Sequence, residues 1–413
     1  MSVSSGRVVV TGLGAVSALG LDVEANWASA RDGIGGIAAR LFDPGPNGPE
    51  GHVTPTAMVP DGANAALEAA LGRRVGNSLD DFALYALKAA QEAMAQAGLI
   101  AAPVAGERMA AVFGQGFAGL HTLEAGFERF YGQKAARLHP LTVPKVMVSA
   151  PVSAIAIEFG VKGPVFGVSS ACASSGHAIA QGASLIRSGL ADVAIVGGSE
   201  AINTPGCLRA WEGLQAMSPS TCRPFSAGRD GMAIGEGAAA MILETEDHAL
   251  ARGATILAEL AGVGMSSDAF HWTQPSLDGA LAAMRPALGQ AGLLEGGGQV
   301  LISTHGTGTP LNDKNETQAI HAAFGDRAKD HPVIATKSGH GHLIGASTAL
   351  QGVIGLKALA AKLAPPILNY LGPDPDCDLD LVLERARPIE ANALLLNAFA
   401  FGGLNTCLVF KLA

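Results

Sequence analysis

The chain has few charged residues and no excess of basic ones. Asp, Glu, Lys and Arg make up 15 % of the 413 residues, and the formal net charge is −9 at pH 7. A general nucleic-acid-binding protein carries a basic face, so this charge balance argues against that class. A local basic spot for an acidic partner remains compatible with the composition.

Cysteine is scarce and is not spaced as metal ligands are. The five cysteines are Cys172, Cys207, Cys222, Cys377 and Cys407. Their number is odd, and no pair has the spacing of a CxxC motif or of a zinc site. A reduced, cytoplasmic environment fits this usage best.

The sequence has neither a convincing signal peptide nor a convincing membrane span. The run VVV after Arg7 is interrupted by the glycines of TGLGAV, which favours a first strand and turn. Residues 391–410 carry no charge and have the length of a span, but they contain Asn392, Asn397, Asn405 and the pair Gly402–Gly403. We expect a buried strand-turn-strand there, and a soluble protein.

Apolar residues and glycine are abundant instead. Hydrophobic residues make up 48 % of the chain, which is enough for a large core, and 54 residues are glycine. A glycine surplus without a short repeat, above the usual frequency of roughly 7 %, predicts tight turns and close backbone approaches. No low-complexity segment and no long linker divides the chain.

Runs rich in Val and Ile alternate with alanine-rich helical stretches at 80–98, 172–189 and 344–362. This alternation predicts an α/β fold with a largely parallel sheet that is buried on both faces. Strand 165–168 with its helix, and strand 333–335 with the helix that follows it, look like echoes of each other. They indicate a duplicated chain that divides near residue 250, into halves 1–252 and 253–413.

Cys172 lies in SSACASSGHA, directly after the apolar run VFGV. At the first turn of a helix, a thiol is favoured as thiolate, and free N–H groups can stabilise an oxyanion. Position alone leaves a reactive thiol and an inert core cysteine equally open. His177 is five residues further on, off the cysteine's helical face, and is expected to be structural.

More informative polar residues follow two later strands. THGTGTPLNDKNE places His305 at a strand end, with the hydroxyls of Thr307 and Thr309 available for a flexible polar substrate arm. TKSGHGHLIGAS places Lys337 and His342 in a glycine-rich turn before a helix. Because sites in α/β sheets gather at the carboxyl ends of strands, these residues are candidate partners for the cysteine.

Five motifs in this order resemble the elongating β-ketoacyl-[acyl-carrier-protein] synthases. They are GPVFGVSSACASSGHA, CRPFSAGRDGMAIGEGAA, THGTGTPLNDKNE, TKSGHGHLIGAS and NAFAFGGLNTCLV, and the opening RVVVTGLGAVSALG is also similar. The resemblance covers the chain end to end. It implies the thiolase fold, in which two βαβαβαββ halves form a five-layered α-β-α-β-α core, usually in a homodimer.

The resemblance also implies roles for individual residues. Cys172 matches the acylated nucleophile, and His305 and His342 match the two catalytic histidines. Lys337 and Glu316 match the charged residues that support the histidines, and Thr307 and Thr309 match the threonines that bind phosphopantetheine. Phe401 matches the residue whose backbone N–H contributes to the oxyanion hole. Phe399 matches the gating phenylalanine, and Asp313 matches an aspartate that orders a loop.

Several positions depart from the family's pattern. Met232 stands where Phe is common near the decarboxylation site, and Ala400 replaces a Gly between Phe399 and Phe401, which could stiffen the gate. Phe117 replaces smaller residues that line the acyl pocket, so we expect it to restrict chain length. His340 is a further departure and is expected to be a loop residue. Gln351 stands near the position where some members have a Glu that contributes to a bound cation.

The implied reaction is the decarboxylative condensation of an acyl group on Cys172 with malonyl-carrier protein. It needs no metal and no redox cofactor, and the implied partner is an acidic acyl carrier protein, with no nucleic acid and no membrane. The basic residues expected at the docking site are Arg73, Arg74, Arg129 and Lys134.

Two other readings were weighed against an active condensing enzyme. A non-catalytic chain-length-factor-type subunit of a heterodimer typically lacks the nucleophilic cysteine, which is present here. A thiolase needs a second cysteine in a C-terminal CxG-type motif, which Cys407 does not provide. The stretch EGLQAMSPSTCRPFSAGRDG leans weakly toward specialised nodulation-type synthases rather than housekeeping elongation.

Overall fold

A long mixed sheet built from two similar groups of strands organises the molecule. The computed structural model describes residues 6–46, 48–72, 78–102 and 104–413. The first group of strands is β1 (Val8–Ser17), β4 (Met109–Gly114), β5 (Val165–Val168), β6 (Val193–Glu200) and β8 (Gly237–Thr245). The second group is β9 (Ala258–Ser267), β10 (Val300–Ser303), β11 (Val333–Ile334), β14 (Ala393–Ala400) and β15 (Leu404–Leu412).

The two groups repeat one topology. The ten strands run in the order β11-β10-β14-β15-β9-β1-β8-β6-β4-β5, so each strand of one group has a counterpart in the other. The two groups join through β1 and β9, which pair antiparallel at Val9↔Glu259 and Val10↔Ala258. This repeat confirms the duplicated α/β fold, while the boundary after residue 252 stays a prediction.

The prediction of a largely parallel sheet was wrong. In each group the three outermost strands are parallel, but the two strands nearest the centre run antiparallel to their neighbours. β14 and β15 are joined by a short turn, which forces an antiparallel pair. Helices cover both faces, so every strand is an apolar run whatever its direction, and the sequence pattern does not distinguish the two cases.

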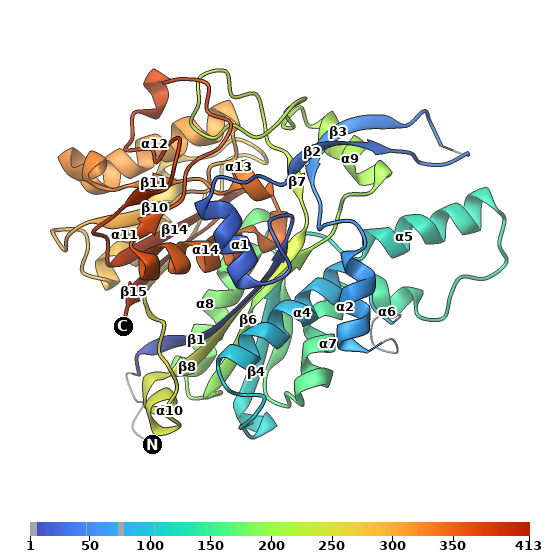
Figure 1. Ribbon diagram of the computed structural model, residues 1–413, viewed down its shortest axis with the longest axis horizontal. Coiled ribbons are helices and arrows are strands. Elements are labelled where there is room, and N and C mark those ends of the chain that lie inside the picture. Colours follow the sequence, from blue (N-terminus) through green and yellow to red (C-terminus); the bar gives the residue numbers. More distant parts are fainter. Residues whose placement is uncertain (1–5, 47, 73–77, 103) are drawn as a thin grey trace.

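The helices form three layers around the two groups of strands (Figure 1). α4 (Asp81–Gln96) and α7 (Ala150–Phe159) cover the outer face of the first group, and α11 (Leu277–Gln290) and α12 (Pro310–Phe324) cover that of the second. α8 (Ser174–Arg187) and α14 (Ser347–Ala361) lie between the groups and share one apolar core with both. These layers agree with the expected α-β-α-β-α arrangement.

Glycine explains how closely these layers approach each other. A Cβ on Gly14 of β1 would lie 1.8 Å from the carbonyl oxygen of Ala89 in α4. The same clash, again at 1.8 Å, would arise in the second half between Gly264 of β9 and Ala283 of α11. The first strand of each half therefore carries glycine where its outer helix contacts the strand backbone.

Two long apolar stretches belong to the core of this fold. Residues 391–410 form the hairpin β14–β15, as expected from their asparagines and glycines. The segment Ile344–Ala361, which includes α14, is long and apolar enough to cross a membrane by length and composition, but 83 % of it is buried inside the protein. The apolar side chains of this segment pack in the core between the two halves.

The remaining elements form the site's surroundings and the surface. They are α1 (Val23–Arg31), β2 (Ile37–Phe42), β3 (His52–Ala57), α2 (Ala63–Leu71), η1 (Gly106–Arg108), α5 (Leu120–Phe127), the π-helical turn η2 (Glu128–Gly132), α6 (Thr142–Val146), η3 (Ala171–Ala173), α9 (Pro205–Gly213), β7 (Ile234–Gly235), α10 (Glu246–Ala251), η4 (Gly325–Asp330), α13 (Lys337–His340), η5 (Ile344–Ala346), β12 (Leu363–Ala364), η6 (Pro375–Cys377) and β13 (Arg387–Pro388).

Candidate active site

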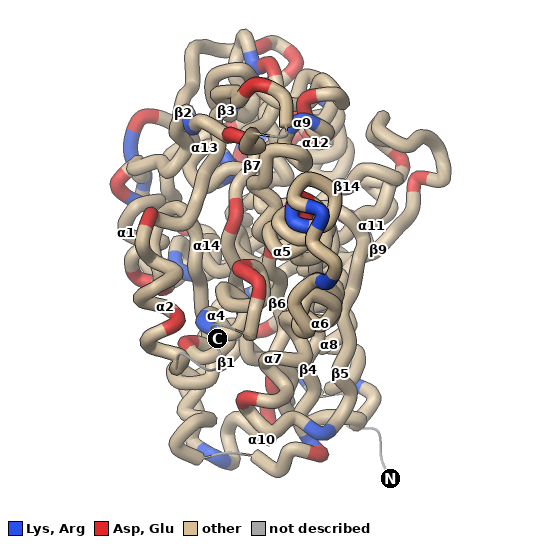
Figure 2. The backbone as a smooth tube through the Cα atoms, turned by 90° about the vertical axis from the view of Figure 1, so that its right-hand side faces the viewer, with Lys and Arg blue, Asp and Glu red and all other residues tan. Residues whose placement is uncertain are grey.

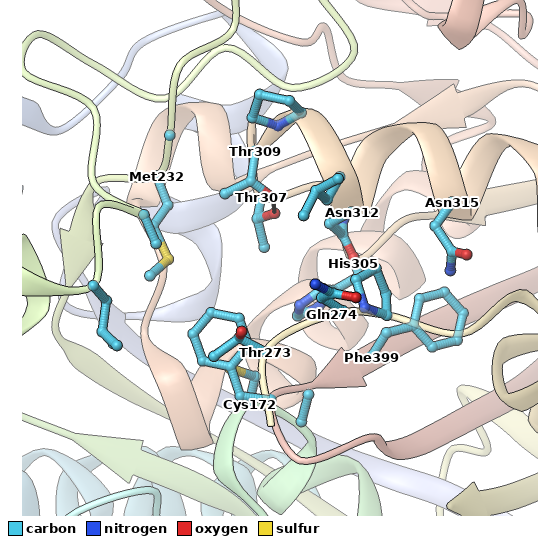
Figure 3. Close-up of a pocket in the computed structure, with 18 of the residues that line it drawn as sticks. Cys172, Met232, Thr273, Gln274, His305, Thr307, Thr309, Asn312, Asn315 and Phe399 are labelled. Carbon is cyan, nitrogen blue, oxygen red and sulfur yellow. Dashed lines mark hydrogen bonds between the residues drawn. The ribbon is translucent and has the colours of Figure 1, made fainter. Parts of the chain in front are cut away.

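A cavity of about 530 Å³ leads from the surface to Cys172. Cys172 lies at its inner end, with His305 and Phe399 on one side, Met232 on the other, and Thr307 and Thr309 further toward the mouth (Figure 3). His342, Ala400 and Phe401 also line it. The structure therefore brings together most of the residues that the sequence singles out, from both halves of the chain.

Cys172 lies in a strained turn between strand and helix. β5 ends at Val168, Ala171 has a φ of 49°, and Cys172 follows in η3 directly before α8. In the second half Ile344, with a φ of 42°, occupies the equivalent place: it is the first residue of η5, as Ala171 is of η3, and α14 follows. Left-handed backbone costs energy for a residue with a side chain, so both turns are held by the surrounding structure.

The sulfur of Cys172 faces main-chain donors. The backbone N–H groups of Phe401 and of Cys172 itself both donate toward it. Burial raises the pKa of the thiol to about 11, although Lys337 and these N–H groups act in the opposite direction. The N–H groups at the start of the helix favour the thiolate, as expected, but desolvation of the buried sulfur outweighs them in the resting site.

The two imidazoles lie beside each other and expose the same ring nitrogen. Their ring centroids are 5.5 Å apart, in an edge arrangement. Nδ1 of His342 accepts the N–H of Ile344 at 3.0 Å, so the proton of the neutral ring is on Nε2. Nδ1 of His305 lies 3.5 Å from the Lys337 ammonium, which favours the same tautomer. Both rings thus present an N–H donor to the cavity.

Burial keeps both imidazoles uncharged. The pKa values of His305 and His342 lie well below the usual value, first because of burial and then because of the Lys337 charge. Their ligand atoms and the Cys172 sulfur lie within 4.8 Å of one another, a spacing that would also suit a metal ion. The neighbouring ammonium opposes a cation there.

Lys337 is fully buried in α13 and its amine is satisfied by neutral groups. Nζ donates to the carbonyl oxygen of His305 and, at 2.7 Å, to Oε1 of Gln351. The amide of Gln351 in turn donates to the carbonyl of Thr304. Burial lowers the pKa of Lys337 to about 8. Gln351 therefore fixes the lysine without adding a carboxylate to the site.

Glu316 and Asp313 act on the main chain of the His305 loop. The Glu316 carboxylate accepts the N–H groups of His305 at 2.8 Å and Gly306 at 2.9 Å, and burial raises its pKa to about 7. Asp313 accepts the N–H groups of Gly308 and Phe225. Both carboxylates order loops and neither lines the cavity, so they position groups that do.

The threonines and the gate residues lie where the sequence places them. The Thr307 and Thr309 hydroxyls are 2.9 Å apart on the cavity wall. Phe399 lies edge-on to His305, with ring centroids 6.2 Å apart. Ala400 is buried at the end of β14 without a left-handed backbone, so the extra methyl is accommodated without strain.

One expectation about a histidine was wrong. His340 is the last residue of α13 rather than a loop residue, and it is fully buried. Its Nε2 lies 2.9 Å from the Thr336 hydroxyl, and it does not line the cavity. α13 is one helical turn, and all four of its residues are buried. His177 bonds the Ser170 hydroxyl, as a structural residue would.

An aromatic row beside Cys172 includes a residue that sequence reasoning missed. The ring of Phe117 is 6.0 Å from that of Trp211 on α9, which stacks at 6.2 Å on Phe401. All three belong to the apolar cluster that contains Cys172. Phe117 therefore adjoins the sulfur through this cluster rather than through the open cavity. The sequence signal that could have identified this residue is Trp211 itself, a large aromatic side chain in a helix that otherwise looks exposed.

The structure describes two of the four predicted docking residues. Arg73 and Arg74 lie outside the described residues. Arg129 and Lys134 are exposed at and after η2. Arg137 is exposed close by and extends this basic segment.

Similarity to known proteins covers the whole chain. Residues 5–249 match the family model "Beta-ketoacyl synthase, N-terminal domain" and residues 257–371 match its C-terminal counterpart. Nodulation protein E of Rhizobium sp. (strain N33) is 41 % identical over 405 residues, covering 98 % of this chain and 99 % of the relative. The 3-oxoacyl-[acyl-carrier-protein] synthase 2 of Staphylococcus aureus (strain COL) is 33 % identical over 413 residues, covering 98 % of each.

Solved structures agree with this similarity. The ishigamide ketosynthase/chain length factor superposes with a TM-score of 0.90 at 31 % identity, covering 99 % of this chain and 100 % of the other. This chain also superposes on a chain from the structure of a type II polyketide-synthase acyl-carrier protein in complex with its ketosynthase bound to the hexaketide. The TM-score is 0.88 at 29 % identity, and the match covers 99 % of this chain and 100 % of the other.

Proposed function

Because the chain belongs to the β-ketoacyl synthase family and is an acyltransferase of that type, we propose that it condenses an acyl group on Cys172 with malonyl-carrier protein. The observation that carries this proposal is the surrounding of one sulfur by two main-chain N–H groups and two neutral imidazoles at the end of a cavity. The products are β-ketoacyl-carrier protein, carbon dioxide and free carrier protein.

The first half-reaction is a transthiolation. The Cys172 sulfur attacks the carbonyl carbon of an acyl thioester, and the tetrahedral oxyanion forms beside the N–H groups of Cys172 and Phe401. The carrier thiolate then leaves and takes up the proton that Cys172 gives up, so no net proton is consumed. The positive charge of Lys337 stabilises the negative charge as it develops on sulfur.

The second half-reaction makes the nucleophile. The carboxylate of malonyl-carrier protein leaves as carbon dioxide, and the electron pair delocalises onto the thioester oxygen as an enolate. The Nε2–H groups of His305 and His342 donate to that oxygen. The enolate carbon then attacks the Cys172 thioester, and the collapsing intermediate returns the cysteine as a thiol after it takes up a proton. No step requires a metal or a redox cofactor.

A reconstituted assay tests this function. Purified protein with hexanoyl- and malonyl-carrier protein is expected to form a β-ketoacyl product and to release one carbon dioxide per product. Carbon dioxide without a condensed product, or neither, would reject the proposed activity.

We expect Phe117 to limit the length of the acyl primer. Its ring fills apolar space next to Cys172 and Trp211 that several methylenes would otherwise occupy. Each buried methylene is worth about 0.8 kcal/mol, so opening space for three or four by Phe117→Gly should favour long primers by on the order of 50-fold. The measurement is kcat/KM for tetradecanoyl against hexanoyl primers.

A control variant separates this effect from a general change. Phe270→Gly removes a ring that is exposed at 68 % on the surface, outside the apolar cluster, and should leave the ratio unchanged. An unmodified protein that already elongates both primers equally would show that Phe117 is not the barrier.

The carrier protein is expected to dock on the basic segment at and after η2. Figure 2 shows Lys and Arg positions along the chain after α5. The double variant Arg129→Glu, Lys134→Glu should raise KM for carrier-bound substrates roughly tenfold, because reversed charges slow the encounter with an acidic partner. Small thioester mimics, and the control Arg385→Glu in the second half, should show little change. Equal effects on carrier-bound and small substrates would refute docking there.

The assembly is proposed to be a dimer. β5 is the edge strand of the sheet, and the elements near it expose large apolar side chains to solvent. These are Val143, Met147, Ile157 and Phe166, on and beside α6, α7 and β5. Exposed apolar area of this kind marks a protein interface. We assign it to a second copy of this chain; a chain-length-factor-like subunit is the alternative occupant.

A specialised pathway is favoured over housekeeping elongation, in the cytoplasm. The support is the higher identity to a nodulation protein, 41 %, than to a 3-oxoacyl-[acyl-carrier-protein] synthase 2, 33 %. A non-catalytic partner subunit is disfavoured, since Cys172, His305 and His342 occupy one site.

A further inference from the structure

Glu200 is a buried carboxylate that the mechanism above does not use. It is the last residue of β6, and it is fully inaccessible to solvent. A buried carboxylate is costly unless its lone pairs are satisfied. Here the partners are main-chain N–H groups rather than a cation, so the carboxylate is held by the backbone of the loops around it.

Those N–H groups come from two loops that belong to different halves. Oε2 accepts the N–H of Gly116 at 2.7 Å and the N–H of Gly345 at 2.9 Å, and Oε1 accepts the N–H of Phe117 at 3.1 Å. The two glycines touch, because a Cβ on Gly345 would lie 2.3 Å from the nitrogen of Gly116. One carboxylate thus clamps the loop after β4 against the loop after α13.

The two loops that Glu200 holds together lie beside the two parts of the proposed site, the acyl-binding part and the enolate-binding part. Phe117 packs in the apolar cluster with Cys172, where the acyl chain must go. Gly345 lies three residues after His342, which faces the enolate oxygen. Burial raises the pKa of Glu200 to about 7, whereas the three N–H donors favour its carboxylate form, whose charge-assisted hydrogen bonds are roughly twice as strong as neutral ones.

We propose that Glu200 is a positioning residue for primer selection, which holds the Phe117 main chain against Gly345 and so fixes where the phenyl ring ends the acyl pocket. This inference rests on the proposed function. It adds a residue that touches neither substrate but sets the depth of the pocket.

The variant Glu200→Gln tests the clamp while preserving shape. A glutamine side chain has one acceptor oxygen. With that oxygen in the place of Oε2, Gly116 and Gly345 stay bonded and the Phe117 N–H loses its acceptor; in the place of Oε1, Phe117 stays bonded and both glycine N–H groups lose theirs. Either orientation leaves a buried donor unpaired and frees either the Phe117 main chain or the contact between the two loops. We expect kcat/KM for tetradecanoyl relative to hexanoyl primers to rise about tenfold, since a small displacement of a positioning group has a large kinetic effect. A merely structural role would lower both rates and leave their ratio unchanged.

Two further variants make the result specific. Glu92→Gln is the matched control: Glu92 accepts the N–H groups of Ala15 and Val23, far from the cavity, and its loss should not alter the ratio. In the double variant Glu200→Gln, Phe117→Gly, the ratio should not exceed that of Phe117→Gly alone, because the ring that Glu200 positions is gone.

Each outcome decides the proposal. An unchanged ratio in folded Glu200→Gln, or full additivity with Phe117→Gly, overturns the role of Glu200 alone. If Glu200→Gln does not fold, Glu200→Asp, which withdraws the carboxylate by one methylene, gives the same readout. Failure of both to fold while Glu92→Gln folds would make Glu200 a fold residue and would also overturn it. Absence of any condensed product from the unmodified protein rejects the proposed function, and the role of Glu200 with it.

Discussion

Replacement of Cys172 by alanine is expected to abolish condensation, by at least about 10⁴-fold. The sulfur is the proposed acyl acceptor, and no other thiol lines the cavity among the residues that the structure describes. Malonyl decarboxylation should persist in this variant, because His305 and His342 stay in place and the enolate forms without the thiol. Mass spectrometry after incubation with acyl-carrier protein should show one acyl group on the unmodified chain and none on the variant.

The matched control is Cys377→Ala. Cys377 is also a free, buried cysteine, but it packs in a separate apolar cluster with Phe225 and Ile367. Its removal should leave acylation and condensation close to those of the unmodified protein. Retained elongation in Cys172→Ala would reject the assignment of the nucleophile.

Removal of either cavity-facing imidazole is expected to slow decarboxylation by roughly 10² to 10³, the cost of one oxyanion donor. His305→Ala and His342→Ala each delete an Nε2–H that faces the enolate oxygen. Acylation of Cys172 should survive in both, because its oxyanion is held by the main chain at Phe401. The measurement is release of labelled carbon dioxide from malonyl-carrier protein, alongside the extent of acylation.

His340→Ala is the control for this pair. His340 is two residues from His342 and equally buried, but its ring bonds Thr336 and does not reach the cavity. We expect most decarboxylation activity to remain in this variant. A larger loss from His340→Ala than from His342→Ala would show that the wrong histidine of the two has been assigned.

Much of the site could be predicted from the sequence because its parts are local. Cys172, His305 and His342 each follow a short apolar strand, and glycine or small residues surround them. Glycine and small residues mark where a strand ends, and the carboxyl ends of parallel strands lie at the same edge of a sheet. The resemblance to a known family then supplied the roles, and the structure places these three residues at one cavity.

Other features depended on contacts that no local pattern records. Trp211 and Glu200 are separated from Cys172 by many residues, and neither lies in one of the motif segments that contain the predicted catalytic residues. Glu200 has a function in this fold only because β6 ends where the loops of Gly116 and Gly345 meet. The prediction for His340 was wrong because a glycine-rich segment is typical of a loop, whereas Lys337–His340 is one buried helical turn in the structure.

The sequence by itself determined the α/β fold class, the hint of a duplication and the family resemblance that assigns Cys172 the role of nucleophile, because apolar periodicity and short motifs depend on neighbouring residues. Only the tertiary structure decided the direction of the central strands, the tautomers of the two imidazoles and the protonation of the Cys172 thiol. Strand direction follows from connection lengths across the whole sheet. Tautomers and pKa values follow from burial and from donors such as Lys337, which approach from segments far apart in the chain.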